Sequence, residues 1–304
     1  MPTQTKITTM DEAIRQFVHD GDVIVIEGFT HLICFAAAHE IIRQHRRDLT
    51  VCRLTPDIIY DQLIGAGCVQ RLVFSWAGNP GVGPLYALRR AVEQSIPNSI
   101  ELEEYSHYGM VARLTAGAAK LPFYPLRDYM GSDLPRVNSM IKTVTCPFTG
   151  EELAAVPALN PDTAIIHAQR ADKNGNAQIW GLIGVQKEAA FASRHTIVVA
   201  EELVSESLIR SDPNRTLIPG IIVDAVVCEP FGCHPSYAQG YYDRDNEFYV
   251  RWRETSQIEA QFNQYLDEWV YGVRDRREYV RRMGDDLDRL KARSHYSEPV
   301  NYGY

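Results

Sequence analysis

The chain has 304 residues, of which 45% are hydrophobic, and its 31 basic and 39 acidic side chains give a formal net charge of -8. This length can bury a sizeable core, and the balance of apolar and charged residues is that of an ordinary globular protein. The negative charge argues against nucleic acid or an anionic membrane as the main partner. No apolar run approaches the roughly 18 residues of a membrane helix, and no signal pattern opens the chain, so the sequence predicts a cytoplasmic protein.

The first predicted elements are a helix, a strand, a glycine turn and a second helix. Thr9 and Glu12 have the spacing of a capping box, which starts a helix. An uninterrupted apolar run at residues 23–26 then predicts a strand covered on both faces, as in a parallel sheet. The run breaks at Gly28, and helical spacing begins at Phe35.

Strands and helices continue to alternate, which predicts an open α/β fold with a largely parallel sheet flanked by helices. Further strands are expected at residues 49–53, 72–75, 100–105, 163–168, 177–181, 196–200 and 221–228. Helical spacing with many charges in residues 254–292 predicts helices on the outside. The pattern lapses between residues 121 and 158, which contain five prolines. We therefore predict a single domain, residues 1–304, with an irregular excursion at about 121–158 over one end of the sheet.

The turn after the first apolar strand is one candidate binding edge. Ligands of such folds bind at the carboxyl ends of the strands. Gly28 has no Cβ, so its backbone can approach a ligand closely, and Phe29 and Thr30 come next. The alternative is a turn that only connects two elements.

A second candidate is the end of the strand predicted at residues 100–105. Glu103, Glu104, Ser106 and His107 lie there within five residues. Because successive side chains of a strand point to opposite faces, only one of the two glutamates can face a given site. The alternative is a solvated strand end.

No pattern of metal ligands is recognisable. Cys228, Cys233 and His234 do not have the spacing of a zinc site. His39 and His45 are six residues apart, whereas the zinc-protease helix requires four. His167 ends an apolar strand, where a histidine is more often hydrogen-bonded in the core than catalytic. We predict no metal site.

The sequence resembles the family I coenzyme A transferases. Residues 20–29 are similar to the amino-terminal signature of that family, in which an apolar strand leads into Gly-Gly-Phe. The chain departs from the signature at Glu27, where the first glycine is expected, and at Ile33 and Phe35. Further stretches resemble the A-subunit branch that includes glutaconate CoA-transferase. They are residues 103–106, 121–123, 156–157, 164–169, 175, 179–181, 194–196, 201–202, 223–227, 230–232, 234–236 and 268–270.

The resemblance implies an A subunit that works with a B subunit, in an A2B2 or larger hetero-oligomer. The pair would move CoA between an acyl-CoA and a small, glutaconate-like dicarboxylic acid. CoA is then the substrate carrier, and no cofactor is bound permanently. The acyl-accepting glutamate of such enzymes is on the B chain, in a Ser-Glu-Asn-Gly signature, and the present sequence contains no such motif.

Two alternatives stay open at this point. A related two-subunit branch hydrolyses carbon–carbon bonds in ring-derived acyl-CoA thioesters of steroid-type degradation, and it uses a glutamate of the A chain at the strand end occupied here by Glu104. A non-catalytic protein that binds acyl-CoA or a small acid is the other. The resemblance therefore implies that Glu104 is pocket-lining or catalytic, and that Gly28, Phe29, Thr30, Ser106 and His107 bind substrate.

Overall fold

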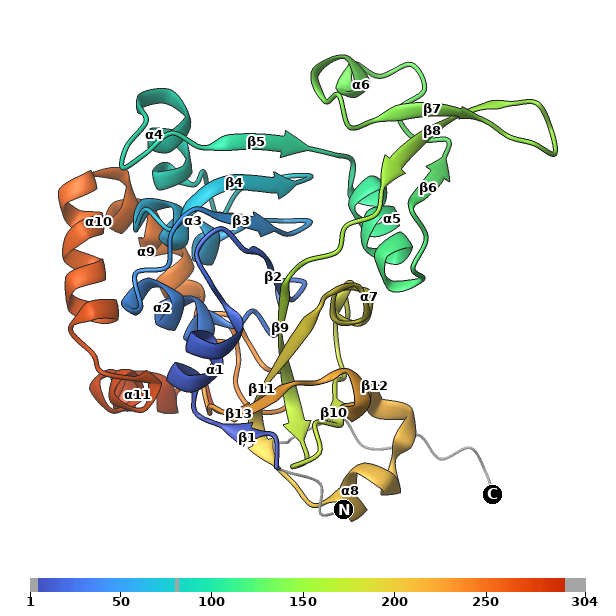
Figure 1. Cartoon of the computed structure of the whole chain (residues 1–304). Coiled ribbons are helices and arrows are strands. Elements are labelled where there is room, and N and C mark those ends of the chain that lie inside the picture. The colour runs from blue at the N-terminus through green and yellow to red at the C-terminus, as the bar shows by residue number, and fades with distance from the viewer. Residues whose placement is uncertain (1–4, 80–81, 293–304) are drawn as a thin grey trace.

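The computed structural model describes residues 5–79 and 82–292, whose central feature is a mostly parallel sheet between two layers of helices (Figure 1). Ten described strands form this sheet, and eight of them follow the order β1-β13-β11-β9-β2-β3-β4-β5. The strands are β1 (Ile7–Thr8), β2 (Val23–Glu27), β3 (Leu49–Cys52), β4 (Val69–Phe74), β5 (Glu101–Glu104), β9 (Thr163–Ala171), β10 (Ala177–Gln178), β11 (His195–Leu203), β12 (Thr216–Ile218) and β13 (Ala225–Cys228). The predicted fold class is confirmed.

The helices of the main body lie between these strands and at the end of the described chain. They are α1 (Met10–Phe17), α2 (Phe35–Arg43), α3 (Ile58–Gly65), α4 (Tyr86–Gln94), α5 (His107–Ala118), α7 (Gln186–Ala192), α8 (Glu206–Ser211), α9 (Asn246–Gln257), α10 (Glu259–Leu266), α11 (Arg276–Met283) and α12 (Asp285–Asp288). Short 3-10 turns cover Pro213–Arg215 and Gly220–Ile222, and a π-helical turn covers Asp267–Tyr271. Among the described residues no helix has the length and apolarity that crossing a membrane requires.

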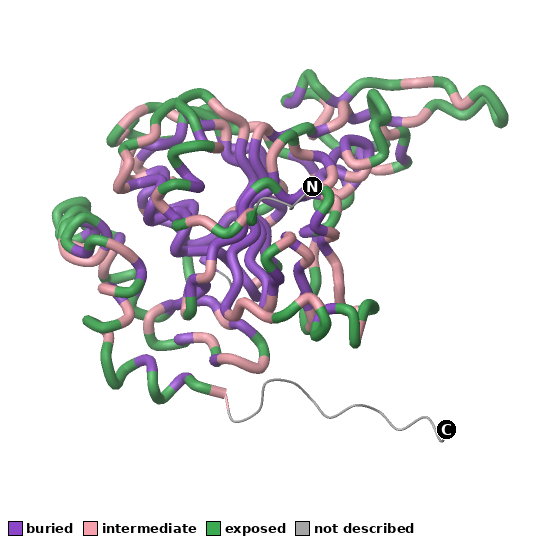
Figure 2. Tube along the Cα trace, turned by 60° about the horizontal axis from the view of Figure 1, so that its bottom comes forward, coloured by how far each residue is buried: buried purple, intermediate pink, exposed green. Residues whose placement is uncertain are grey.

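The core has two halves, one on each face of the sheet. Ile24 and Ile26 of β2 pack into one half, whereas Val25 packs into the other, as the alternation of strand side chains requires. The first half is completed by α1, α2, α3, α4, α9 and α10, and the second by α5, α7 and α12. Figure 2 shows the buried residues concentrated in the central strands. A sheet covered on both faces explains why β2 is apolar without alternation.

Residues 121–158 are more regular than the sequence predicts. They form a separate three-stranded antiparallel sheet, β6 (Phe123–Leu126), β8 (Glu152–Pro157) and β7 (Lys142–Thr145), with the short helix α6 (Leu134–Val137). Figure 1 shows this sheet extending away from the main body beyond α5. Pro125 and Pro157 occur within its strands, and prolines there obscure a strand pattern because they cannot donate a ladder hydrogen bond.

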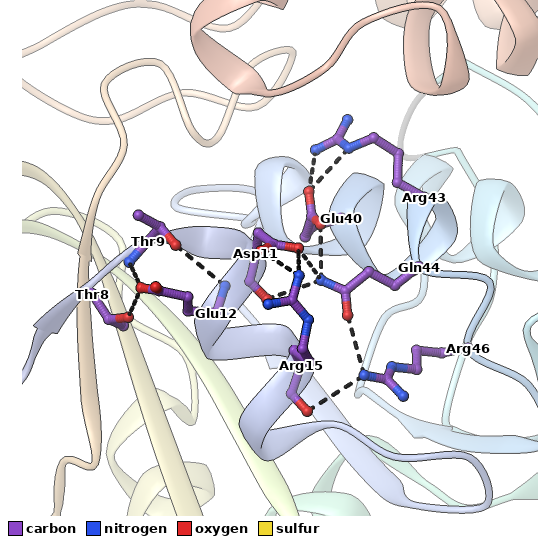
Figure 3. Close-up of polar contacts among 9 residues, drawn as sticks. All are labelled: Thr8, Thr9, Asp11, Glu12, Arg15, Glu40, Arg43, Gln44 and Arg46. Atoms are coloured by element: carbon purple, nitrogen blue, oxygen red, sulfur yellow. Dashed lines mark hydrogen bonds and ion pairs between the residues drawn. The ribbon is translucent and has the colours of Figure 1, made fainter.

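The predicted capping box of α1 is confirmed, and a polar network joins α1 to α2 (Figure 3). The Glu12 amide donates to Thr9 Oγ1 at 3.3 Å, and the Thr9 amide donates to Glu12 Oε2 at 3.3 Å. Gln44 Nε2, just after α2, donates to the Asp11 carbonyl oxygen at 2.9 Å and to Glu40 Oε1 at 2.9 Å. These contacts fix α1 against α2 and so fix how the chain enters β2.

We expect Thr9→Ala to lower the free energy of unfolding by about 1 kcal/mol, the usual effect of losing a side-chain cap. Urea denaturation measures this value. Thr255→Ala is the matched control, because Thr255 lies half-buried near the end of α9 and its hydroxyl donates to the Arg251 carbonyl oxygen instead of capping a helix start. The control should change the free energy by less than about 0.5 kcal/mol. Equal effects of the two substitutions would show that the capping box contributes nothing.

Candidate active site

The turn after β2 requires glycine at position 28. A Cβ built there would lie 2.6 Å from the carbonyl oxygens of both His31 and Leu32, closer than real Cβ contacts. Thr30 and Leu32 have φ values of 57° and 56°, in the left-handed region. Phe29 remains 38% exposed at the carboxyl edge of the sheet. The turn is therefore tight, and an aromatic side chain projects from it.

His31 joins this turn to the loop formed by residues 181–184. Its Nε2 accepts a hydrogen bond from the Gln239 amide at 3.0 Å, so Nδ1 carries the proton and donates to the Leu182 carbonyl oxygen at 3.0 Å. Burial lowers the pKa of His31 to about 4, which keeps the ring neutral near pH 7. The two segments thus form one wall beside the ends of β2 and β9.

Buried charged side chains contact the backbone of the Gly28 turn. The Arg53 Nη2 group donates to the Gly28 carbonyl oxygen, and Arg53 Nη1 lies 3.3 Å from Asp57 Oδ1. Arg53, Asp57 and Glu27 are each 2% exposed. Burial raises the pKa of Glu27, and the positive charge of Arg53 opposes that rise.

A second polar group forms where β3, β4 and β5 end. The exposed His107 ring lies 3.0 Å from Thr55 Oγ1 and 2.8 Å from Ser75 Oγ. Thr55 follows β3, Ser75 follows β4 and His107 begins α5 after β5, so three neighbouring strand ends contribute one side chain each. Hydroxyl and imidazole groups at such an edge can donate to a carboxylate or a thioester oxygen.

The two adjacent glutamates of β5 have different surroundings. Glu103 Oε1 accepts from the Tyr105 hydroxyl at 2.7 Å and from Arg113 Nη1 at 2.9 Å. Glu104 is exposed and lines a cavity of about 380 Å³ between β5 and residues 137–140. The Asn138 side chain donates to the Glu104 carbonyl oxygen at 2.7 Å, which holds the second sheet against this edge. Glu104 is thus the glutamate that is open to a ligand or a partner chain.

Ser106 is engaged within the protein. Its hydroxyl accepts from the Gly109 amide at 2.9 Å as the cap of α5, and it donates to Asp128 Oδ2 at 2.6 Å. Ser106 therefore has a structural role, and its predicted role in substrate binding stays a prediction.

Within residues 5–79 and 82–292, one buried cluster brings potential metal-ligating atoms together. The candidate ligand atoms of His167, Glu201 and Cys233 lie within 4.8 Å of one another. Glu201 Oε1 already accepts from His167 Nε2 at 2.7 Å and from the Tyr242 hydroxyl at 2.5 Å, and Glu201 Oε2 accepts from the Phe231 amide at 2.7 Å. The carboxylate therefore has protein donors, and His167 is hydrogen-bonded in the core.

A larger cavity of about 820 Å³ lies away from the predicted site residues. It is bounded by α1, α2, the end of β13 and residues 274–277, and none of the predicted site residues lines it. It contains both acidic and basic side chains, so its charge does not favour one class of ligand.

The predicted site residues fall into two groups on the carboxyl edge of the sheet. Gly28, Phe29 and Thr30 follow β2, whereas Glu104, Ser106 and His107 end or follow β5. Because β3 and β4 lie between them, the groups are separated by three strand spacings, about 14 Å. An extended thioester can span that separation.

Sequence reasoning missed Thr55, Ser75 and the loop at residues 181–186. Ser75 ends one predicted strand and Thr55 comes two residues after another, so the rule that strand ends carry sites could have identified them. Gln186 comes five residues after the strand predicted at residues 177–181, and only the contacts of Gly184 with Glu27 and Phe29 show that this loop lies beside the Gly28 turn.

Comparison with known proteins gives the family. Residues 7–229 match the family model described as coenzyme A transferase. The chain is 50% identical over 280 residues to the A subunit of 3-oxoadipate CoA-transferase of Pseudomonas knackmussii. The aligned residues are 92% of this chain and 99% of that one. It is 30% identical over 286 residues to the IpdA subunit of the cholesterol ring-cleaving hydrolase of Mycobacterium tuberculosis, covering 88% of this chain and 94% of that one.

The glutaconate enzyme of Acidaminococcus fermentans is similar in both sequence and structure. Its A subunit is 35% identical over 297 residues, which cover 92% of each chain. The crystal structure of that enzyme matches with a TM-score of 0.91, over 98% of this chain and 99% of the other. The chain therefore belongs to the coenzyme A transferase family and is of the type found as the A subunit in its two-chain enzymes.

Proposed function

We propose that this chain is the A subunit of a two-chain CoA-transferase that moves CoA between an acyl-CoA and a small dicarboxylic acid. The observation that carries the proposal is the 50% identity to the 3-oxoadipate CoA-transferase A subunit over 99% of its length. 3-Oxoadipate is the first substrate to test and glutaconate the second, which reverses the preference drawn from sequence motifs.

The nucleophile of the proposed reaction is a glutamate of the B subunit. The present sequence has no Ser-Glu-Asn-Gly motif, and Glu104 is followed by Tyr105 and Ser106. The carboxylate attacks the thioester carbonyl carbon, and departure of the CoA thiolate leaves an acyl-glutamyl anhydride. The thiolate then attacks the glutamyl carbonyl and releases the first acid, which leaves a glutamyl-CoA thioester. The acceptor acid reverses these steps and leaves as acyl-CoA.

This chain contributes one wall of the proposed site. Each attack places negative charge on a carbonyl oxygen, which backbone amides can stabilise by several kcal/mol. Gly28 is buried, and the place of its missing Cβ is taken by the carbonyl oxygens of His31 and Leu32, so the part of this turn that faces outward is Phe29 and Thr30. His107, with Thr55 and Ser75, offers donors for the carboxylate of the acid.

The test is acyl exchange by the co-purified two-chain complex. CoA donors and acids are supplied as a panel that includes 3-oxoadipate, glutaconate, adipate and acetate. We expect exchange with dicarboxylic acids, and 3-oxoadipate should have the highest kcat/KM. Absence of exchange with every acid would overturn the proposal.

A ring-opening acyl-CoA hydrolase is the second candidate. It is favoured by the exposed position of Glu104 at the end of β5 and by the 30% identity to IpdA. CoA-thioester ring opening without exchange would establish it in place of the transferase.

A further inference from the structure

Two buried polar atoms beside the Gly28 turn have no hydrogen-bond partner among the described residues. They are Glu27 Oε2 at the end of β2 and Gln186 Nε2 at the start of α7. Glu27 is 2% exposed and Gln186 is fully buried. Because an unmet buried polar group costs free energy, two of them in adjacent segments indicate a function beyond folding.

The two side chains converge on Gly184. A Cβ built on Gly184 would lie 3.4 Å from Glu27 Oε1, 3.4 Å from Gln186 Oε1 and 3.1 Å from Phe29 Cβ. The Gly184 amide donates to Gln186 Oε1 at 2.7 Å. This bond fixes the orientation of the Gln186 amide and leaves its Nε2 as the remaining donor. A carboxyl group, a side-chain amide and an aromatic side chain therefore pack closely around Gly184.

Partly exposed apolar side chains lie on the two segments that carry the polar pair. Phe29 comes two residues after Glu27, and Leu182 and Ile183 directly precede Gly184; they are 38%, 43% and 45% exposed. Leu182 and Ile183 are in the loop whose position depends on His31. An acyl chain that displaces this loop would find apolar contacts first and the polar pair behind them.

We propose that Glu27 and Gln186 form a subsite that binds the ketone oxygen of a 3-oxoacyl substrate. The inference rests on the proposed function, since it assigns a substrate feature to the same enzyme. Glu27 in its protonated form and Gln186 Nε2 each donate one hydrogen bond to the ketone oxygen, whose two lone pairs accept them. No bond is made or broken at this subsite. The residues determine specificity, whereas the acyl transfer takes place at the thioester.

The chemistry of the pair favours a ketone over a carboxylate. Burial raises the pKa of Glu27, so its carboxyl is more readily protonated than an exposed one. A substrate carboxylate placed beside Glu27 would be repelled by the lone pairs of Glu27 or by the nearby carboxylate of Asp57. Among the described residues Arg53 is the only cation of this cluster, and it already contacts Gly28 and Asp57. A ketone oxygen carries no net charge, so these carboxyl groups do not repel it in the same way.

The experiment compares two acids that differ only in the ketone. Acyl exchange by the two-chain complex is measured with 3-oxoadipate and with adipate, and the ratio of their kcat/KM values is the readout. We expect the wild-type ratio to exceed about ten, because a site built to hydrogen-bond a substrate oxygen rejects the analogue that lacks it.

Three variants then assign that ratio to the pair. Glu27→Gly introduces the residue of the family signature, and Gln186→Leu removes the amide donor. Each should lower the ratio by about tenfold, toward one, mainly by lowering kcat/KM for 3-oxoadipate. Glu27→Gln keeps a donor and should retain the ratio within about threefold. Glu40→Gln is the control, because Glu40 is a buried glutamate of α2 that pairs with Arg43 away from this edge.

The outcomes separate the inference from the proposed function. A wild-type complex that exchanges CoA but uses both acids equally well would overturn the subsite and leave the transferase intact. The subsite would also fail if Gln186→Leu and Glu27→Gly kept the wild-type ratio. A complex with no exchange at all would refute the proposed function itself. If Glu27→Gly does not fold, the wild-type ratio and Gln186→Leu still decide the question.

Discussion

Replacing the acyl-accepting glutamate of the B subunit is expected to abolish acyl exchange, whereas Glu104→Gln in this chain should lower it about tenfold to hundredfold. The second figure corresponds to roughly 1.4 to 2.7 kcal/mol of transition-state stabilisation. The reason is that Glu104 is exposed and lines a cavity, and no base or buried cation among the described residues contacts its carboxylate, as would be expected of a nucleophile. This chain purified alone should show negligible exchange.

The control for Glu104 is Glu93 of α4, which does not line the cavity beside β5. Glu103 is unsuitable, because it accepts from Tyr105 and from the buried Arg113 and its substitution would disturb the fold. Glu101, which pairs with the exposed Arg71, lines the same cavity as Glu104. Glu93 has 51% side-chain exposure and pairs with the exposed Arg89, an interaction of about 0 to 1 kcal/mol, so Glu93→Gln should leave exchange unchanged.

The measurement is the rate of acyl exchange by the reconstituted complex with each variant in turn. If Glu104→Gln abolishes turnover and replacement of the B-chain glutamate has little effect, the A-chain glutamate carries the chemistry. That result would place this chain with the ring-opening hydrolases.

Arg53→Met is expected to lower the free energy of unfolding by about 3 to 5 kcal/mol, because it leaves a buried carboxylate without its cation. Arg53 and Asp57 are both 2% exposed, and the guanidinium also lies 5.6 Å from the centre of the Tyr60 ring. The Gly28 carbonyl oxygen loses its donor in the same variant. Urea denaturation of the purified chain provides the measurement.

The effect of Arg53→Met should depend on pH. Burial raises the pKa of Asp57, and Arg53 opposes that rise, so the variant has a still higher folded-state pKa. A carboxyl whose folded-state pKa exceeds its unfolded value gains stability as pH falls toward the unfolded value. The deficit should therefore be largest near pH 7 and smaller near about pH 5.

Two further variants test this explanation. Asp57→Asn added to Arg53→Met should recover part of the lost free energy, since it removes the unpaired charge. Arg71→Met, which affects an exposed pair, should cost less than about 1 kcal/mol. A loss below about 1 kcal/mol for Arg53→Met, or a deficit that does not vary with pH, would show that the buried charge is not what supports the turn.

Local sequence was sufficient to predict the helices, strands and turns on which the fold depends. The capping box of Thr9 and Glu12, the apolar run of β2 and the glycine at position 28 each act through neighbours a few residues away, so their pattern is legible in the chain itself. Alternation of strands and helices gave the parallel sheet for the same reason. The sheet of residues 121–158 was missed because its prolines suppress the strand signal.

Long-range packing decided the candidate site. The sequence shows that Glu103 and Glu104 face opposite sides of a strand, but Arg113 on α5 determines which of them is engaged in the fold. Likewise, His107 acquires Thr55 and Ser75 as neighbours only because three strands end side by side. Glu27 and Gln186 are 159 positions apart in the sequence, and only the folded backbone brings them to the same glycine. Sequence by itself thus determined the family, the sheet and its binding edge, whereas tertiary structure decided which polar groups at that edge are satisfied and which are available to a ligand, because hydrogen-bond partners and burial are properties of the packed chain.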